Sequence, residues 1–107
     1  MSSLDIQEIA TSDPSSNKQV TYQLTGRLDT LTAPGLQEKL IPALETHPIV
    51  RLDFTNLTYL SSAGLRVLLI GEKTAKARGN RLELLNVSDA VLDVLRMTGF
   101  DQILLIS

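Results

Sequence analysis

LDFTNLTYLSSAGLRVLL, residues 52–69, is the stretch that decides the fold. Apolar and polar residues alternate at its start, which predicts a half-buried strand, because successive side chains of a strand point to opposite faces. After a short turn, we expect the serine pair Ser61-Ser62 to open an apolar helix. The start of such a helix carries partial positive charge. The two hydroxyls therefore stand where a phosphate group is favoured.

Composition restricts the classes of protein to which this chain can belong. Its 107 residues, 43% hydrophobic and 21% charged, suffice for one domain with its own core, so we expect a single domain over residues 1–107. The formal net charge of −2 gives no basic excess with which to bind nucleic acid.

Targeting and metal chemistry are restricted in the same way. No apolar run approaches the roughly 20 residues of a membrane span, and the start of the chain lacks the pattern of a secretion signal. Cysteine is absent and His47 is the only histidine, which excludes disulfides, thiolate ligands and histidine-rich metal sites. We therefore expect a cytoplasmic protein with no membrane insertion, no metal and no cofactor of its own.

The first part of the chain predicts a hairpin. Residues 4–11 and 19–25 have the pattern of strands, and the polar residues 12–18 between them form the loop. Alternation in the second strand predicts one buried and one wet face, and Gly26 is expected to end that strand.

A helix and a third strand follow the hairpin. The helix is expected to begin near Thr32, with Pro34 tolerated in its first turn. Leucines at positions 36, 40 and 44 repeat at helical spacing and mark its buried face. Pro48 closes the connection into the third strand, in which Val50, Leu52 and Phe54 alternate with charged residues.

The second half of the chain repeats the alternation of helix and strand. The helix opened by the serine pair is expected to run to about Arg78, because Gly79-Asn80 is a C-terminal signal. Residues 81–87 predict a fourth strand. Ser88-Asp89 opens a third helix that ends at Gly99, and residues 102–106 predict a short last strand.

Alternation within the strands decides between two α/β architectures. A doubly wound sheet is covered on both faces, so its strands are almost entirely apolar. The second and third strands here carry polar residues at every other position, and right-handed crossovers in one direction stack the helices on one face. We therefore expect a mixed sheet of four to five strands in sequential order, with helices mainly on one face and the other face largely solvated. No glycine-rich phosphate loop follows any strand, which argues against a dinucleotide-binding fold.

Ser62 has two interpretations. As a serine before an apolar helix, it is placed to cap that helix. Its hydroxyl oxygen would then accept a hydrogen bond from an unpaired backbone N–H one turn into the helix. It could instead receive a phosphoryl group, whose charge near −2 would face the unpaired amides of the helix start. Such a modification would change the charge of a surface patch, which is what a binding switch requires.

Two motifs resemble one family, the STAS domains of bacterial anti-sigma factor antagonists. Residues 59–65, YLSSAGL, are similar to the family's segment of an aromatic-hydrophobic pair, an aspartate, the phosphoacceptor serine, a second hydroxyl residue and Gly-Leu. Residues 26–33, GRLDTLTA, are similar to its Gly-x-Leu-Asp loop, which in the family lies beside the acceptor serine. The resemblance extends over nearly the whole chain. Ser61 stands in place of the aspartate, and Ala63 removes one hydroxyl.

The resemblance implies a regulatory protein that binds an anti-sigma factor serine kinase of the histidine-kinase-like ATPase class and releases the sigma factor which that kinase holds. The kinase would phosphorylate the antagonist and end the interaction, and a PP2C-type phosphatase would reset it. Register from Gly64-Leu65 makes Ser62 the expected phosphoacceptor, with Ser61 as the second choice. The expected partner-binding residues are Leu28, Asp29, Thr30, Ser61, Ala63, Gly64 and Arg66. The protein is expected to be a monomer or weak dimer.

Local alternatives stay open for several of these residues. Asp29 either caps the next helix or pairs with Arg27, or else contacts the partner. Arg66 is either a solvated surface residue or meets a phosphate or an acidic partner. Tyr59 and Phe54 are expected to pack in the core or at an edge.

Other functions are also open. An enzyme is not expected, because no base accompanies Ser62 and the turn lacks the Gly-x-Ser-x-Gly elbow. A STAS subunit of a lipid or anion transport system would use the same face without phosphorylation. A scaffold could self-associate through the apolar residues 103–106.

Overall fold

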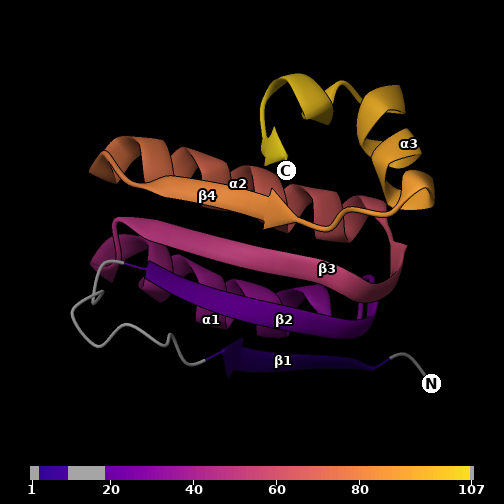
Figure 1. Cartoon of the computed structure of the whole chain (residues 1–107), viewed down its shortest axis with the longest axis horizontal. Coiled ribbons are helices and arrows are strands. Elements are labelled where there is room, and N and C mark those ends of the chain that lie inside the picture. Colours follow the sequence, from indigo (N-terminus) through magenta and orange to yellow (C-terminus); the bar gives the residue numbers. More distant parts are fainter. Residues whose placement is uncertain (1–2, 10–18, 107) are drawn as a thin grey trace.

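A computed structural model describes residues 3–9 and 19–106 and shows a mixed sheet of five strands in the order β1-β2-β3-β4-β5 (Figure 1). Strand β1 (Leu4–Ile9) pairs antiparallel with β2 (Gln19–Leu28), and all later pairings are parallel. The remaining strands are β3 (Ile49–Leu60), β4 (Arg81–Leu85) and β5 (Leu105–Ile106). The mixed sheet in sequential order and the hairpin are confirmed. The expected loop 12–18, and the end of the first strand at residues 10–11, lie outside the described residues.

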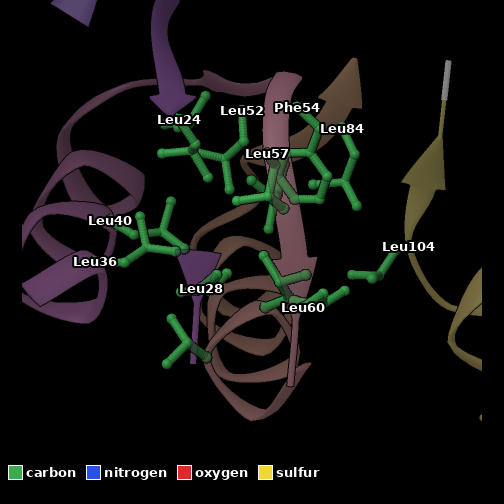
Figure 2. Close-up of a cluster of buried hydrophobic side chains, with 14 of the residues drawn as sticks. Leu24, Leu28, Leu36, Leu40, Leu52, Phe54, Leu57, Leu60, Leu84 and Leu104 are labelled. Atoms are coloured by element: carbon green, nitrogen blue, oxygen red, sulfur yellow. The ribbon is translucent and has the colours of Figure 1, made fainter. Parts of the chain in front are cut away.

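Helices α1 (Ala33–Thr46) and α2 (Ser62–Arg78) run side by side along one face of the sheet (Figure 1). Helix α3 (Asp89–Met97) and the 3-10 turn η1 (Phe100–Gln102) lie near β4 and β5. Leu36, Leu40 and Leu44 of α1 are fully buried, as the helical spacing predicts. All three belong to one hydrophobic core with the leucines of β2 and β3, and Figure 2 shows Leu36 and Leu40 within it. Right-handed connections between parallel neighbours place both helices on this face.

Strand β2 corrects the prediction that Gly26 ends it, because the strand continues to Leu28. Gly26 has φ of 115°, and the β2–β3 register shifts on either side of it. A Cβ at this position would lie 2.4 Å from the Ser3 carbonyl oxygen, so the close approach of β1 requires glycine. The glycine therefore bends the strand at a bulge and does not stop it.

Strand β3 corrects a second expectation, since no turn separates it from the serine pair. The polar residues around Asn56 are extended, and the strand runs to Leu60. Register shifts against β2 change the alternation, so that Leu57 and Leu60 are buried three residues apart. The bulges allow polar residues to leave the core face without ending the strand.

The C-terminal elements are shorter than predicted. Strand β4 ends at Leu85 because Asn86 adopts φ of 56° and donates its side-chain amide to Asp53 Oδ1 at 3.1 Å. Residues 100–102 form a 3-10 turn, so only Leu105–Ile106 remain for β5. The start and end of α3 match the prediction, with Ser88 capping its first turn and Gly99 at φ of 77° just beyond it.

The polar face of the sheet is less solvated at its centre than expected. Arg51 donates to Glu83 Oε1 at 2.9 Å and also to the side chain of Gln19. The Arg51 and Glu83 side chains are only partly exposed. Cross-strand pairing of this kind lets a charged side chain lie flat on a sheet with its charge satisfied.

Candidate functional site

The two serines at the start of α2 have different structural roles. Ser61 is the N-cap of α2, with φ of −95° and ψ of 174°, and its Oγ accepts from Gly64 N at 3.4 Å. The prediction that Ser62 caps the helix is therefore wrong. An N-cap residue has non-helical dihedral angles. Ser61 is the last extended residue before α2, whereas Ser62 is already helical.

Ser62 is left exposed on the first turn of α2. Within residues 3–9 and 19–106, its hydroxyl forms no hydrogen bond. Its neighbour holds the backbone in place, because Ser61 N donates to Leu28 O at 3.0 Å and Leu65 N donates to Ser61 O at 3.0 Å. The end of β2 and the start of α2 are thus joined at the residue beside Ser62.

Asp29 organises the turn that faces the serine pair. Its side chain is almost fully buried, and Oδ1 accepts from Leu31 N at 3.0 Å and from Thr32 N at 3.3 Å. Arg27 Nε lies 3.7 Å from its other oxygen. Asp29 therefore orders the turn before α1 and pairs with Arg27, the structural role that the sequence left open; contact with a partner stays a prediction.

Tyr59 completes this edge of the site. The Arg27 guanidinium lies 4.1 Å from the centre of the Tyr59 ring, a cation–π contact between β2 and β3. Tyr59 is partly exposed, whereas Phe54 is buried in the core. The expected core packing is confirmed for Phe54, whereas Tyr59 lies on the central strand β3 with its ring exposed against Arg27.

A groove of about 240 Å³ lies between the start of α1 and the start of α2. We call it the serine groove; it is lined by Thr30, Ala33, Pro34, Gln37, Ser62, Ala63, Arg66 and Val67. The structure thus brings together four of the residues predicted for the site, namely Thr30, Ser62, Ala63 and Arg66. The sequence did not indicate Pro34, Gln37 or Val67, since they belong to ordinary helical positions.

The other predicted site residues lie beneath the groove. Leu28 is fully buried and Gly64 is also buried, so neither presents a side chain to a partner in this conformation (Figure 2 shows Leu28 beside Leu60 in the core). A Cβ at Gly64 would lie 2.7 Å from Leu28 Cγ and 2.8 Å from Leu60 Cδ1. Gly64 and Leu28 therefore set how closely α2 approaches β2, and Ser61 and Asp29 fix the two backbone segments above them.

The charge of the serine groove is positive. Among the described residues that line it, Arg66 is the only charged one, and α2 has no acidic residue in its first turn. Arg66 forms no ion pair with any residue that the structure describes. Together with the positive end of α2, this arrangement favours an anion at the groove.

Leu31 is a feature that the sequence reasoning missed. Its side chain is 76% exposed, at the tip of the Asp29 turn. It borders a second hollow of about 430 Å³ between β1 and α1. Of its chain neighbours, Thr30 lines the serine groove and Thr32 lines this second hollow. A leucine inside a polar turn was the available signal, because burial is the usual reason for a large apolar side chain.

Glu72 on α2 was missed as well. It is buried, and its Oε2 has no hydrogen-bond partner among the described residues. Burial raises the pKa of Glu72 above the usual carboxyl value, while nearby Lys76 opposes this effect. Glu72 does not line the serine groove, so it bears on stability and not on the site.

Two kinds of feature are absent from the described residues. Residues 3–9 and 19–106 contain no group of three or more His, Cys, Asp or Glu side chains that could hold a metal ion. Over the same residues, no helix has both the length and the apolar character needed to cross a membrane.

Comparison with known proteins gives a consistent result. The family model described as "Mlab, STAS domain" matches residues 11–106. The anti-sigma-B factor antagonist of Bacillus subtilis is 32% identical over 88 residues, which are 82% of this chain and 81% of that protein.

Solved structures share the fold at lower identity. The anti-sigma factor antagonist SpoIIAA in its unphosphorylated form superposes with a TM-score of 0.74 at 20% identity, over 96% of this chain and 87% of that one. SpoIIAA of Bacillus in the phosphorylated form gives 0.72 at 20% identity, over 96% and 91%. A sulfate transporter family protein from Wolinella succinogenes gives 0.72 at 23% identity, over 80% and 70%.

Proposed function

Because the chain belongs to the STAS domain family, and its curated relatives are anti-sigma factor antagonists, we propose that it is such an antagonist, switched off by phosphorylation of Ser62. In the unphosphorylated form it binds an anti-sigma factor that is also a serine kinase, and the bound sigma factor is released. The chain is a regulatory binding protein of the cytoplasm and catalyses no reaction itself.

The observation that carries this proposal is that Ser61 caps α2 and leaves the Ser62 hydroxyl available. Ser61 Oγ already accepts the Gly64 amide, so the cap of α2 does not depend on Ser62. The Ser62 hydroxyl is exposed and forms no hydrogen bond with a described residue. Of the described residues that line its groove, Arg66 alone is charged, and that charge is positive. An acceptor hydroxyl must reach into another protein's active site, and Ser62 meets this requirement where the half-buried Ser61 does not.

The transfer itself requires nothing further from this chain than the hydroxyl. Ser62 Oγ forms a bond to the γ-phosphorus of ATP held by the kinase, the bond from that phosphorus to ADP breaks, and the hydroxyl proton passes to a base of the kinase or to water. A PP2C-type phosphatase would reverse the state by hydrolysis, in which water supplies the oxygen that leaves with phosphate.

The phosphoryl group would end binding without unfolding the domain. Its charge near −2 would lie at the positive end of α2, where an anion is stabilised. The surface formed by Thr30, Ala63 and Arg66 would change from positive to negative. A partner surface that fits the first state is repelled by the second, which is the mutual exclusion that an antagonist requires.

The proposal is tested by phosphate mapping. The purified chain is incubated with candidate anti-sigma kinases from the same genome and ATP, and phosphate is located by mass spectrometry in wild type, Ser62→Ala and Ser61→Ala. We expect phosphate on Ser62, loss of phosphate in Ser62→Ala alone, and weaker kinase binding after phosphorylation. Phosphate on Ser61 would reassign the acceptor.

Binding without phosphate transfer would overturn the switch. It would favour a docking subunit of a lipid or anion transport system, a reading with which the fold shared with a sulfate transporter family protein is compatible. Self-association with no kinase binding would favour a scaffold through the partly exposed Ile103 and Leu105; light scattering over a concentration series separates it from the expected monomer or weak dimer.

A further inference from the structure

Arg66 and Ser62 occupy neighbouring positions on one helix. They are four residues apart on α2, the spacing at which helical side chains lie one above the other. Helical side chains generally lean toward the N-terminus of their helix, so the turn that carries Ser62 is within the general reach of a residue at position 66. Both residues are exposed and both line the serine groove.

The remaining lining offers Arg66 no competing charge. The other described residues that line the groove are neutral, and Arg66 has no ion pair within the described part of the chain. By contrast, Arg27 at the edge of the site is engaged by Asp29 and Tyr59. Arg66 is therefore the cation at this surface that is available to an incoming anion.

We propose that Arg66 is the residue through which phosphorylation releases the partner: in the unphosphorylated protein it binds a carboxylate of the partner, and in the phosphorylated protein it is captured by the phosphate on Ser62. This inference rests on the proposed function and adds the chemistry of the contact. An arginine fork binds either anion with two parallel hydrogen bonds. Since one guanidinium serves one anion in this geometry, the phosphate both adds negative charge and removes the cation that the partner needs.

The intramolecular half of the proposal can be tested without any kinase. Phosphoserine is incorporated at position 62 during synthesis, in one protein that keeps Arg66 and in a second that carries Arg66→Gln. The phosphate of each protein is then titrated with pH and followed by ³¹P NMR. A guanidinium beside the phosphate favours the dianion, so Arg66→Gln should raise the pKa of the phosphate. An identical titration in both proteins would overturn the capture of Arg66.

The matched control is Arg81→Gln, which removes the same charge at the opposite end of the sheet. Arg81 pairs with Ile49 at the start of β3, whereas Ser62 follows the end of that 12-residue strand. Arg81 is exposed and has no ion pair among the described residues. Its substitution should leave the phosphate titration unchanged.

The intermolecular half uses the unphosphorylated proteins and the kinase partner. Arg66→Gln should weaken binding by about three- to tenfold and reduce its dependence on salt, while Arg81→Gln should do neither. A wild-type chain that neither binds nor accepts phosphate would refute the proposed function. A wild type that does both, with Arg66→Gln binding equally well and with the same salt dependence, would refute this inference alone.

Discussion

Substituting alanine at two glycines, Gly64 and Gly35, gives a direct measure of how closely α2 packs on the sheet. Both are the third residue of their helix, Gly64 in α2 and Gly35 in α1. The gain in helix propensity, up to about 1 kcal/mol, and the loss of freedom in the unfolded chain are therefore similar for both. The difference between the two variants isolates the packing of the added methyl group.

The surroundings of the two positions differ sharply. A Cβ at Gly35 meets no atom within 4 Å, whereas a Cβ at Gly64 would lie 2.7 Å from Leu28 Cγ and 2.8 Å from Leu60 Cδ1. Carbon atoms at optimal contact are about 3.5–4.0 Å apart, so α2 or both leucines must move by about 1 Å. Overpacking of this kind costs about 1–3 kcal/mol. Gly64→Ala should therefore be less stable than Gly35→Ala by about 1–3 kcal/mol.

Urea unfolding of both variants and the wild type provides the measurement. A change of 1 kcal/mol corresponds to about 4–8 °C in Tm for a domain near this size, so thermal unfolding resolves the difference independently. We expect Gly35→Ala at or above the wild type and Gly64→Ala below it. Equal stability of the two variants would show that the contact of Gly64 with Leu28 is not tight and would refute the reasoning.

Three further predictions follow from single residues. Ser61→Ala should lose about 1 kcal/mol of unfolding free energy, as should the matched cap variant Ser88→Ala, while Ser62→Ala stays within about 0.5 kcal/mol of wild type; an equal loss in Ser62→Ala would return the cap to Ser62. The raised pKa of Glu72 means that the folded state holds its proton more tightly than the unfolded state, so its contribution to stability falls as the pH rises from the usual carboxyl value through the raised one. Glu72→Gln should therefore exceed the wild type in urea unfolding at neutral pH, with the gap closing as the pH is lowered through that range, and a gap independent of pH would contradict the assignment. Leu31→Ala should leave Tm unchanged because the side chain is 76% exposed, yet it should weaken kinase binding by at least about fivefold. Met97→Ala, at a position that is 86% exposed, is the control, and unchanged binding of Leu31→Ala would exclude Leu31 from the interface.

Several parts of this protein were predictable because they depend on neighbours in the sequence. Periodicity located α1 through Leu36, Leu40 and Leu44, since a helix buries every third or fourth residue wherever it packs. Gly79 marked the end of α2, and it adopts the left-handed conformation that glycine permits. Two short motifs at the right separation indicated the family, because the chemistry of a site restricts residue types more than the rest of the fold does.

Other parts depended on contacts that no local pattern records. Gly26 was expected to end a strand, and a turn was expected before the serine pair, yet β2 and β3 continue through both places, because the pairing of β2 with β1 and β3 outweighs low local strand preference. The capping serine was decided by the backbone angles of Ser61, which are fixed by the hydrogen bond to Leu28 across the sheet.

The sequence by itself determined the order of helices and strands, the family and the serine pair, since each is encoded in residues close together along the chain. Only the tertiary structure decided that Ser61 caps α2 while the Ser62 hydroxyl bonds to no described residue, and that Arg66, Thr30 and Gln37 line one groove. The physical reason is the packing of α1 against α2. It brings together residues about thirty positions apart, and its closeness depends on the absence of a side chain at Gly71, where a Cβ would lie 2.9 Å from Leu40 Cδ2 and 3.3 Å from Leu44 Cδ1 of α1.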